Sequence, residues 1–319
     1  MNGNKFLLGI LMCLIAVISW GGMFPVMGNA LTIMDPFYFT LLRYGSAALI
    51  FILLLIVLEG KGKLSTEGQT GKVFFFGTMG FAGFSFLVFL GQQLAGPSGA
   101  VIAAVIMAVQ PLLGIIVNWV TKKAAPKFVT VLFMLTGLIG VVMVISKGDL
   151  RVFVSEEGNI FANLLILIGA LCWVIYTSGG SSFPTWSPLR YTTVTTIYGV
   201  VSISIIVGFA TLVGWLKVPT LSIIGDVSGA LLYMIFIAGV LAVFVWNYGN
   251  KIITPINGIL FMNLVPITTF IISVIQGYHL TIFELVGALI TIASLVANNI
   301  YIRKLTKQIS TQPKVKAAQ

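Results

Sequence analysis

Charged side chains are scarce in this sequence of 319 residues, where Asp, Glu, Lys and Arg make up 8%, against roughly 25% in an ordinary soluble domain. Acidic groups are the rarest, with 8 Asp and Glu beside 18 Lys and Arg and a single His. In their place the chain has 58% hydrophobic residues and a mean hydropathy of +1.08. This composition excludes a soluble enzyme and indicates a polytopic membrane protein.

Motifs that carry chemistry are also missing. The two cysteines, Cys13 and Cys172, lie in separate apolar runs without a neighbouring Cys or His, so neither a disulfide framework nor a metal cluster is supported. The sequence has no HExxH, GxSxG or phosphate-binding Gly-Lys loop and no pair of carboxylates within one apolar run. We therefore expect no catalytic residue, no metal and no cofactor, and a protein that is not an enzyme.

Long apolar runs fill most of the chain. Each can cross a hydrocarbon layer of ~30 Å as a helix, which takes about 20 residues. The runs predict ten transmembrane helices, at about 6–27, 37–58, 73–93, 98–120, 128–146, 160–179, 191–214, 227–248, 254–276 and 281–302. The predicted fold class is an all-α polytopic membrane protein.

Basic residues predict how these helices are oriented, because cytoplasmic loops carry the excess of Lys and Arg. With a cytoplasmic N-terminus, the inner loops and tail contain Lys5, Lys61, Lys63, Lys72, Lys122, Lys123, Lys127, Arg190, Lys251, Arg303, Lys304, Lys307, Lys314 and Lys316. The outer loops then contain only Lys147, Arg151 and Lys217. This bias predicts that both termini are cytoplasmic, and because the charges lie in short loops we expect no nucleic-acid partner.

An internal repeat links the two halves of the chain. The matching positions are Trp20 with Trp173, Pro36 with Pro188, Pro111 with Pro266, and Gly137 with Gly287. Five helices per repeat is an odd number, so the second copy enters the membrane from the opposite side and the repeats are inverted. We expect a first five-helix repeat at 6–146, an outer connecting loop at 147–159, a second repeat at 160–302 and a basic cytoplasmic tail at 303–319.

Short motifs in both halves carry a family resemblance. In the first half they are Ile18-Ser19-Trp20-Gly21-Gly22-Met23-Phe24, Asp35-Pro36-Phe37, Leu42-Arg43-Tyr44 and Val109-Gln110-Pro111-Leu112. In the second half they are Gly169-Ala170-Leu171-Cys172-Trp173, Asn263-Leu264-Val265-Pro266-Ile267 and Leu285-Val286-Gly287-Ala288. On these motifs the chain resembles the EamA-type, ten-helix members of the drug/metabolite transporter superfamily. The family's Gly-Glu pair after the two prolines is absent, since Lys122-Lys123 and Gly277-Tyr278 stand near those places.

Aromatic and polar residues inside the predicted helices are the candidates for a substrate site at the midplane, between the repeats. We select Trp20, Arg43, Tyr44, Gln110, Trp173, Tyr176, Tyr198 and Asn263 as substrate-binding residues. Filling space between helices is the alternative role of the aromatic rings. Pro111 and Pro266 are candidate hinges, with packing kinks as the alternative. The other tryptophans, Trp119, Trp186, Trp215 and Trp246, are expected near the ends of the helices.

Arg43 has two possible roles, because a charge about seven residues into a helix lies too deep for an ordinary loop. It either bonds backbone carbonyls and ties helices together or contacts the substrate or a gate. Glu284 and Asp226 lie near the outer ends of their helices, so no carboxyl is expected near the midplane. Transport is therefore expected to persist without a pH gradient.

The resemblance implies a secondary transporter or facilitator of small metabolites, such as amino acids, or of amphipathic drugs, working in the direction of export. Inverted repeats predict alternating access around one midplane site. The expected partners are a small-molecule substrate and the lipid bilayer of the cell membrane, and the chain is compatible with a monomer. The alternatives are a flippase for a lipid or lipid precursor, and a membrane sensor or structural protein that moves nothing.

Overall fold

The chain folds into a bundle of helices that confirms the predicted all-α polytopic class. The computed structural model describes residues 3–122, 125, 127–149 and 159–311, and it assigns no strand to these residues. Among them, six helices are long and apolar enough to cross a membrane, and one bent pair makes a seventh span. Three shorter apolar helices, Phe128–Val144, Val265–Ile275 and Ile282–Asn298, belong to the remaining crossings.

The first half of the chain crosses the bundle five times. Its helices are α1 (Gly3–Ala30), α2 (Pro36–Glu59), α3 (Thr70–Gly77) with α4 (Phe84–Leu94), α5 (Gly99–Ala108) with α6 (Gln110–Lys122), and α7 (Phe128–Ser146). Short 3-10 helices, η1 (Lys61–Leu64) and η3 (Gly96–Ser98), lie in the connections.

The second half repeats this order. Its helices are α8 (Ile160–Gly179), α9 (Pro188–Leu212), α11 (Ser228–Leu232) with α12 (Ala242–Ile253), α13 (Pro255–Ile259) with α14 (Val265–Ile275), and α15 (Ile282–Thr311). A short helix α10 (Leu221–Asp226) precedes the eighth crossing, and η5 (Gly180–Ser182) follows α8.

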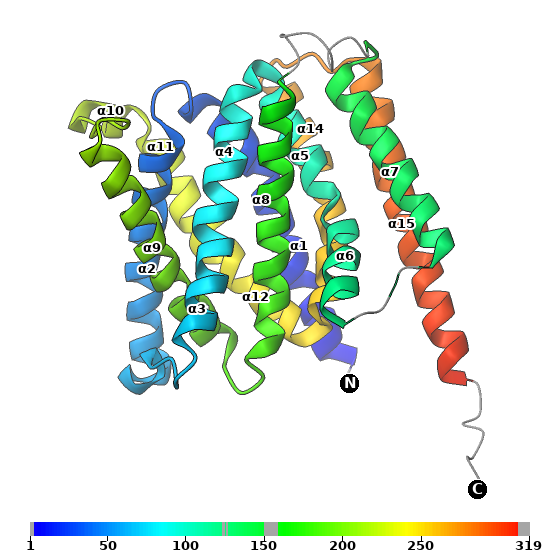
Figure 1. Cartoon of the computed structure of the whole chain (residues 1–319), viewed down its shortest axis with the longest axis horizontal. Helices are drawn as coiled ribbons and strands as arrows, with labels where there is room; N and C mark the ends of the chain where they lie inside the picture. The colour runs from blue at the N-terminus through cyan, green and yellow to red at the C-terminus, as the bar shows by residue number, and fades with distance from the viewer. Residues whose placement is uncertain (1–2, 123–124, 126, 150–158, 312–319) are drawn as a thin grey trace, which may run out of the picture.

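Successive crossings run in opposite directions, so the two halves are inverted. Helix α1 begins and α15 ends at the same end of the bundle, which we call the terminal end (Figure 1). Helix α8, the first of the second half, begins at the other end, which we call the far end (Figure 1). The halves interleave, since α4 lies against α8, α1 against α12 and α2 against α9.

Equivalent helices of the two halves begin with the same local signal. In α2 the Asp35 carboxylate accepts hydrogen bonds from the backbone N–H groups of Phe37 and Tyr38, both at 2.9 Å, and Pro36 is the first residue. In α9 the Ser187 hydroxyl accepts from the N–H of Arg190 at 2.9 Å, again next to a proline. Such caps satisfy N–H groups that have no partner within the helix.

Two crossings in each half depart from regular α-helix at equivalent places. The third crossing of each half contains a π-helical segment, η2 (Thr78–Gly83) in the first and η6 (Tyr233–Leu241) in the second. The fourth crossing of each half breaks at the expected proline: α5 and α6 meet at 43° before Pro111, and the 3-10 helix η7 (Leu260–Leu264) interrupts the helix before Pro266. Such irregular backbone is typical of functional sites.

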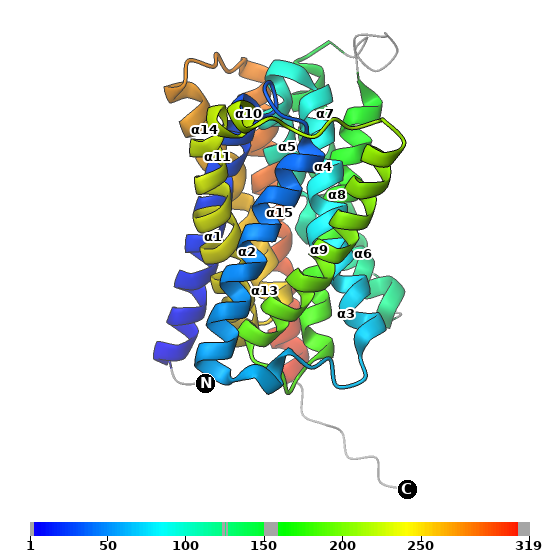
Figure 2. The same cartoon turned by 90° about the vertical axis from the view of Figure 1, so that its left-hand side faces the viewer.

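Helices α7 and α15 form a pair at one side of the bundle (Figure 1), and they lie behind the other helices when the opposite side faces the viewer (Figure 2). They approach so closely that a Cβ added to Gly140 would clash with Thr291 and with the carbonyl of Gly287. A Cβ on Gly287 would in turn meet the carbonyl of Gly140 at 2.5 Å. Glycine lets the two backbones touch at this crossing, which is a common way of packing helices in membranes.

Some sequence expectations need correction. Trp246 was expected near a helix end, but α12 continues to Ile253 and the Trp246 indole is fully buried in the core. Trp186 lies between helices as expected, yet it is buried as well. Helix α15 continues past residue 302 to Thr311, so the first part of the expected tail is helical, while 312–319 lie outside the described residues, as do 150–158 of the expected loop.

Candidate functional site

A closed cavity lies at the centre of the bundle, where the two halves meet. Its wall is formed by α1, α2, α4, α5 and the start of α6 from the first half, and by α8, η7 and α14 from the second. Five of the eight residues selected from the sequence line it: Trp20, Arg43, Tyr44, Gln110 and Trp173. The rest of the wall is apolar and consists of Met23, Phe24, Phe84, Met107, Met262 and Val265.

This cavity is almost filled by its own side chains. The volume of the cavity is only about 20 Å³. Holding one water takes roughly 10–15 Å³ of such volume. The structure therefore represents a closed state, and a solute larger than water can enter only after the helices around it separate.

Two equivalent tryptophans meet at the cavity wall. Trp20 and Trp173 contact each other edge to face, with ring centroids 5.1 Å apart, and Trp246 packs on the other side of Trp20 at 5.2 Å. The Trp20 indole N–H donates to the carbonyl of Ala238 in η6, at 3.0 Å. The two tryptophans that occupy equivalent positions in the repeats therefore also contact each other across the boundary between the repeats.

Arg43 is buried beside these rings and held by backbone. Its Nε donates to the carbonyl of Met234 at 3.1 Å, and its Nη2 donates to that of Ala238 at 3.4 Å. The guanidinium carbon lies 4.5 Å from the centre of the Tyr44 ring. Since both carbonyls belong to η6, Arg43 ties α2 to the irregular part of the eighth crossing.

Three side-chain polar atoms of the cavity wall are fully buried and have no hydrogen-bond partner among the residues that the structure describes. They are Nη1 of Arg43, Nε1 of Trp173 and Oε1 of Gln110, and their residues are 1%, 3% and 1% exposed. The amide nitrogen of Gln110 does have a partner, the sulfur of Met107 at 3.0 Å. Buried polar atoms without partners are rare in native structures because each costs roughly 1–3 kcal/mol.

The other selected residues lie elsewhere. Tyr176 is buried next to the cavity, on the side of the terminal end. Its ring packs on Trp173 at 5.0 Å, and its hydroxyl accepts a hydrogen bond from Asn247 at 2.7 Å. Tyr198 does not reach the cavity: it is half-buried and its ring faces Phe74 at 6.5 Å. Asn263 lies in η7 next to a wall residue, but its side chain is outside the described part of the structure.

A wide vestibule opens at the far end of the bundle. Its volume is about 480 Å³. Its wall includes Gly28 of α1, Gln92 of α4 and Tyr278 between α14 and α15. Gln92 donates to the carbonyl of Phe24 at 2.8 Å, so a thin layer around this bond separates the vestibule from the central cavity.

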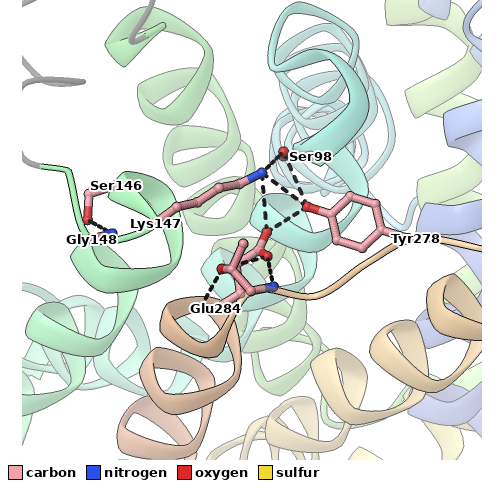
Figure 3. A network of polar contacts seen from close by, with 7 residues as sticks. Ser98, Ser146, Lys147, Gly148, Tyr278 and Glu284 are labelled. Atoms are coloured by element: carbon pink, nitrogen blue, oxygen red, sulfur yellow. Dashed lines mark hydrogen bonds and ion pairs between the residues drawn. The ribbon is translucent and has the colours of Figure 1, made fainter.

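A polar cluster borders this vestibule and joins three connections (Figure 3). Glu284 is fully buried and accepts hydrogen bonds from the Tyr278 hydroxyl at 2.6 Å and from the backbone N–H of Thr281 at 2.8 Å. The Lys147 ammonium lies 3.7 Å from Glu284 and donates to Ser98 at 2.7 Å. With these partners Glu284 has a structural role at the far end, away from the central cavity.

A second polar cluster lies at the terminal end; we call it the latch and define it as Glu59, Glu67, Trp186, Ser187 and Arg190. Arg190 forms an ion pair with Glu67 at 2.8 Å and covers the Trp186 ring at 4.2 Å. The Trp186 indole donates to Glu67 at 3.0 Å, and Ser187 donates to Glu59 at 2.7 Å. Hydrogen bonds from Trp186 and Arg190 lower the pKa of Glu67. The latch joins the α2–α3 connection of the first half to the α8–α9 connection of the second.

Several of these residues were not selected from the sequence. Glu67 and Arg190 look like ordinary loop charges, and nothing in one dimension pairs residues 123 positions apart. A signal did exist for the buried network below the cavity, because Asn247 donates to Thr192 and Tyr176 and lies within an otherwise apolar run. Polar residues inside apolar runs are expensive in a membrane and therefore worth selecting.

Comparisons with known proteins agree with this architecture. The model of the EamA-like transporter family matches residues 7–146 and 160–300. The protein named "Uncharacterized transporter YrdR" of Bacillus subtilis (strain 168) is 43% identical over 304 residues, which cover 95% of each chain. "Uncharacterized transporter YyaM" of the same organism is 32% identical over 265 residues, 82% of this chain and 83% of that one.

A solved structure supports the fold alone. One crystal structure of a protein superposes with a TM-score of 0.67 and 18% sequence identity, and the match covers 96% of this chain and 99% of the other. The family model matches this chain twice, once in each five-helix half. The two curated relatives match this chain over most of their own length. The chain therefore belongs to the EamA-like transporter family and is an integral membrane transporter with two EamA repeats.

Proposed function

We propose that this protein is a facilitator that carries small solutes through the cell membrane by alternating access around the central cavity. Pro111 and Pro266 act as hinges. The binding residues are the five that were selected from the sequence and line the cavity, namely Trp20, Arg43, Tyr44, Gln110 and Trp173. Both termini face the cytoplasm, so the vestibule opens outward, and the direction of net transport is export.

The observation that carries the proposal is a closed cavity between inverted repeats, with a vestibule at one end and the latch at the other. A carrier must close one access route before it opens the second, and inverted halves can exchange the two shapes. The breaks before both prolines and the two π-helical segments lie at equivalent places in the two halves, as an exchange between halves requires.

Counterflow in liposomes tests transport directly. Purified protein is reconstituted with unlabelled solute inside, and uptake of labelled solute is measured for a panel of amino acids, nucleosides and dyes. We expect saturable counterflow that persists when the pH gradient is collapsed, because no acidic side chain in the described residues lines the central cavity. Strict dependence on that gradient would refute facilitated transport.

A matched pair of variants tests whether the cavity is the transport site. Val265→Phe places a larger side chain into the cavity wall, whereas Val274→Phe makes the same change on the same helix at a residue that is 51% exposed. Overpacking costs about 1–3 kcal/mol, so the monodisperse yield of both variants is measured beside flux. We expect Val265→Phe to abolish flux per folded molecule and Val274→Phe to retain it.

Two other outcomes would replace the proposal. Saturable binding of a solute by folded protein that never moves it would favour a membrane sensor. Movement of a labelled lipid between the leaflets, without counterflow of any soluble solute, would favour a flippase.

A further inference from the structure

We infer that the central cavity recognises its solute through a carboxylate group, which binds the free Nη1 of Arg43 and the indole N–H of Trp173. The inference rests on the proposed transport function and specifies its substrate class. The solute is a small organic acid or zwitterion with an apolar body, on which a hydrogen-bond donor adds a further contact. Simple organic cations are excluded.

The first step is the charge of Arg43. In the part of the chain that the structure describes, Arg43 has no carboxylate partner, and the two ion pairs found there, Lys147 with Glu284 and Arg190 with Glu67, lie at opposite ends of the bundle. A charge inside a membrane protein is held by backbone carbonyls or by an ionic partner, because isolating it from water is expensive. Arg43 has the carbonyls but no ionic partner among the described residues, and the carboxylate of a bound solute supplies one.

The second step is the direction of the unused hydrogen-bonding groups. Arg43 has committed Nε and Nη2 to the carbonyls of η6, which fixes the plane of the guanidinium and leaves Nη1 unpaired. Trp173 Nε1 is a second unpaired donor in the same cavity wall. An N–H donor and a cationic donor together suit the two oxygens of a carboxylate, and hydrogen bonds of this kind are roughly twice as strong as neutral ones.

The third step concerns the rest of the solute. Oε1 of Gln110 is an unpaired acceptor, so it suits an ammonium, amide or hydroxyl group of the solute. The remaining wall consists of methionine, phenylalanine, valine and tryptophan side chains and the ring of Tyr44, which favour an apolar body of adaptable shape. With one fixed positive charge and no negative one in the described wall, the site repels cations.

A set of four matched solutes tests the inference without any transport assay. Leucine and 4-methylpentanoate contain the carboxylate, whereas 3-methylbutylamine and leucinamide lack it. Thermal unfolding of the purified protein is measured in detergent with each solute at millimolar concentration. We expect the two acids to raise the melting temperature and the amine and the amide to leave it unchanged. Equal stabilisation by the amine or the amide, or no stabilisation by either acid, would overturn the inference.

An isosteric substitution provides the second test. Gln110→Glu adds a carboxylate to the cavity that contains Arg43, so it competes with the solute for the guanidinium. We expect the affinity for leucine to fall about tenfold or more, since each charge-assisted bond is strong in this setting. Gln69→Glu makes the same change at the start of α3, outside the cavity, and should leave affinity unchanged. Unaltered affinity in Gln110→Glu would contradict the inference.

A third test does not depend on the folding of the Gln110→Glu protein. Trp173→Phe removes the unpaired N–H and retains an aromatic ring, and Trp246→Phe is its control because that buried indole donates to Thr177 instead of lining the cavity. We expect Trp173→Phe to weaken acid binding several-fold more than Trp246→Phe. Equal effects would assign Trp173 to packing alone and would contradict its role as a donor.

The two proposals fail in distinguishable ways. If the acids stabilise the protein but no solute shows counterflow, the transport proposal falls and carboxylate recognition stands. If counterflow is found for amines or neutral solutes and the acids do not compete, transport stands and carboxylate recognition falls.

Discussion

The role of a single side chain in this protein depends on contacts that its position in the sequence does not determine. Arg43 was expected either to tie helices or to face the substrate, and the structure shows two of its nitrogens on the carbonyls of η6 while the third is unpaired at the cavity wall. Holding the guanidinium by two bonds lowers the entropy that the third must lose on binding a solute. The tie between helices thus prepares the contact that we propose.

A second example is Thr269, which repairs a break in α1. Pro25 lies inside that helix and has no N–H to offer, so the carbonyl of Gly21 loses its helical partner. The hydroxyl of Thr269 on α14 donates to this carbonyl at 2.7 Å. The bond stabilises the protein because an unpaired carbonyl at membrane depth is costly. It also joins the two halves, since Gly21 belongs to the first and Thr269 to the second.

We predict that Thr269→Val lowers stability by about 0.5–2 kcal/mol, the range of hydrogen bonds between membrane helices. Thr268→Val is the matched control, because the Thr268 hydroxyl bonds only to the carbonyl of Leu264 in its own segment, at 3.2 Å. Unfolding of both variants is followed by circular dichroism in detergent with increasing denaturant. Equal stability of the two variants would contradict a role for the bond to Gly21.

At the scale of elements, irregular segments occur in pairs. The third and eighth crossings contain π-helices, and the fourth and ninth break before a proline. Three of these features adjoin the cavity: Gln110 of its wall follows the break between α5 and α6, η7 supplies the wall residue Met262, and η6 supplies the carbonyls for Arg43 and Trp20. Breaks at equivalent places allow the two halves to bend in the same manner, as the proposed exchange of access demands.

The crossing of α7 and α15 leads to a prediction about packing. Gly140→Ala should destabilise the protein, because its Cβ meets Thr291 and the backbone of Gly287. Gly208→Ala in α9 is the control: nothing lies within 4 Å of its added Cβ. Alanine is better than glycine in a helix by about 1 kcal/mol, so this control should be neutral or stabilising. Melting temperatures in detergent separate the two, and a Gly140→Ala protein as stable as the control would contradict the close approach.

The latch predicts a pH dependence. The folded state lowers the pKa of Glu67, whose ordinary value is 4.5, so its bonds stabilise the latch above that pH and are lost as the pH falls through the lowered value. Glu67→Gln mimics the protonated form. We expect the melting temperature of the wild type to exceed that of Glu67→Gln at pH 7. The difference should shrink as the pH falls below 4.5 and vanish once the pH is below the lowered pKa of Glu67.

Asp226→Asn, at the exposed end of α10 and outside the latch, is the control for the removal of a carboxylate elsewhere in the protein. A difference between the wild type and Glu67→Gln that stays constant down to strongly acidic pH would mean that the ionised carboxylate does not stabilise the latch.

At the scale of the whole molecule, the structure is a closed state with unequal ends. The far end has the vestibule, while the latch joins the two halves at the terminal end. The bond between Gln92 of the vestibule wall and the carbonyl of Phe24, a residue of the cavity wall, lies between the two spaces. We therefore expect the opening to the far end to require less rearrangement than the opening to the terminal end.

The orientation of this molecule in the membrane is the remaining prediction. Ala125→Cys lies between α6 and α7 at the terminal end, and Ser222→Cys lies on α10 at the far end; both positions are exposed. Intact cells are treated with a membrane-impermeant thiol reagent, and the wild type is the control because Cys13 and Cys172 are buried. We expect labelling of Ser222→Cys alone, since Lys and Arg resist translocation. Labelling of Ala125→Cys alone would reverse the orientation.

Much of the architecture could be predicted without coordinates. Ten apolar runs predicted ten crossings because, in lipid, a helix satisfies its backbone groups within its own segment and a local run of residues suffices. The repeat predicted inverted halves from the odd number of helices, and the matching Trp20 and Trp173 proved to touch. Five of the selected site residues line the cavity for a related reason, since polar and aromatic residues within apolar runs point to the interior.

Tertiary structure alone decided which way each helix turns and what each side chain meets. Tyr198 faces Phe74 instead of the cavity, and Trp246 lies in the core instead of at a helix end, because rotation and length of a helix are set by its neighbours. The latch joins residues more than a hundred positions apart, which only packing can bring together. The sequence by itself therefore determined the spans and their repeat, through the hydrophobicity of local segments, whereas contacts between distant helices determined the cavity and its gates.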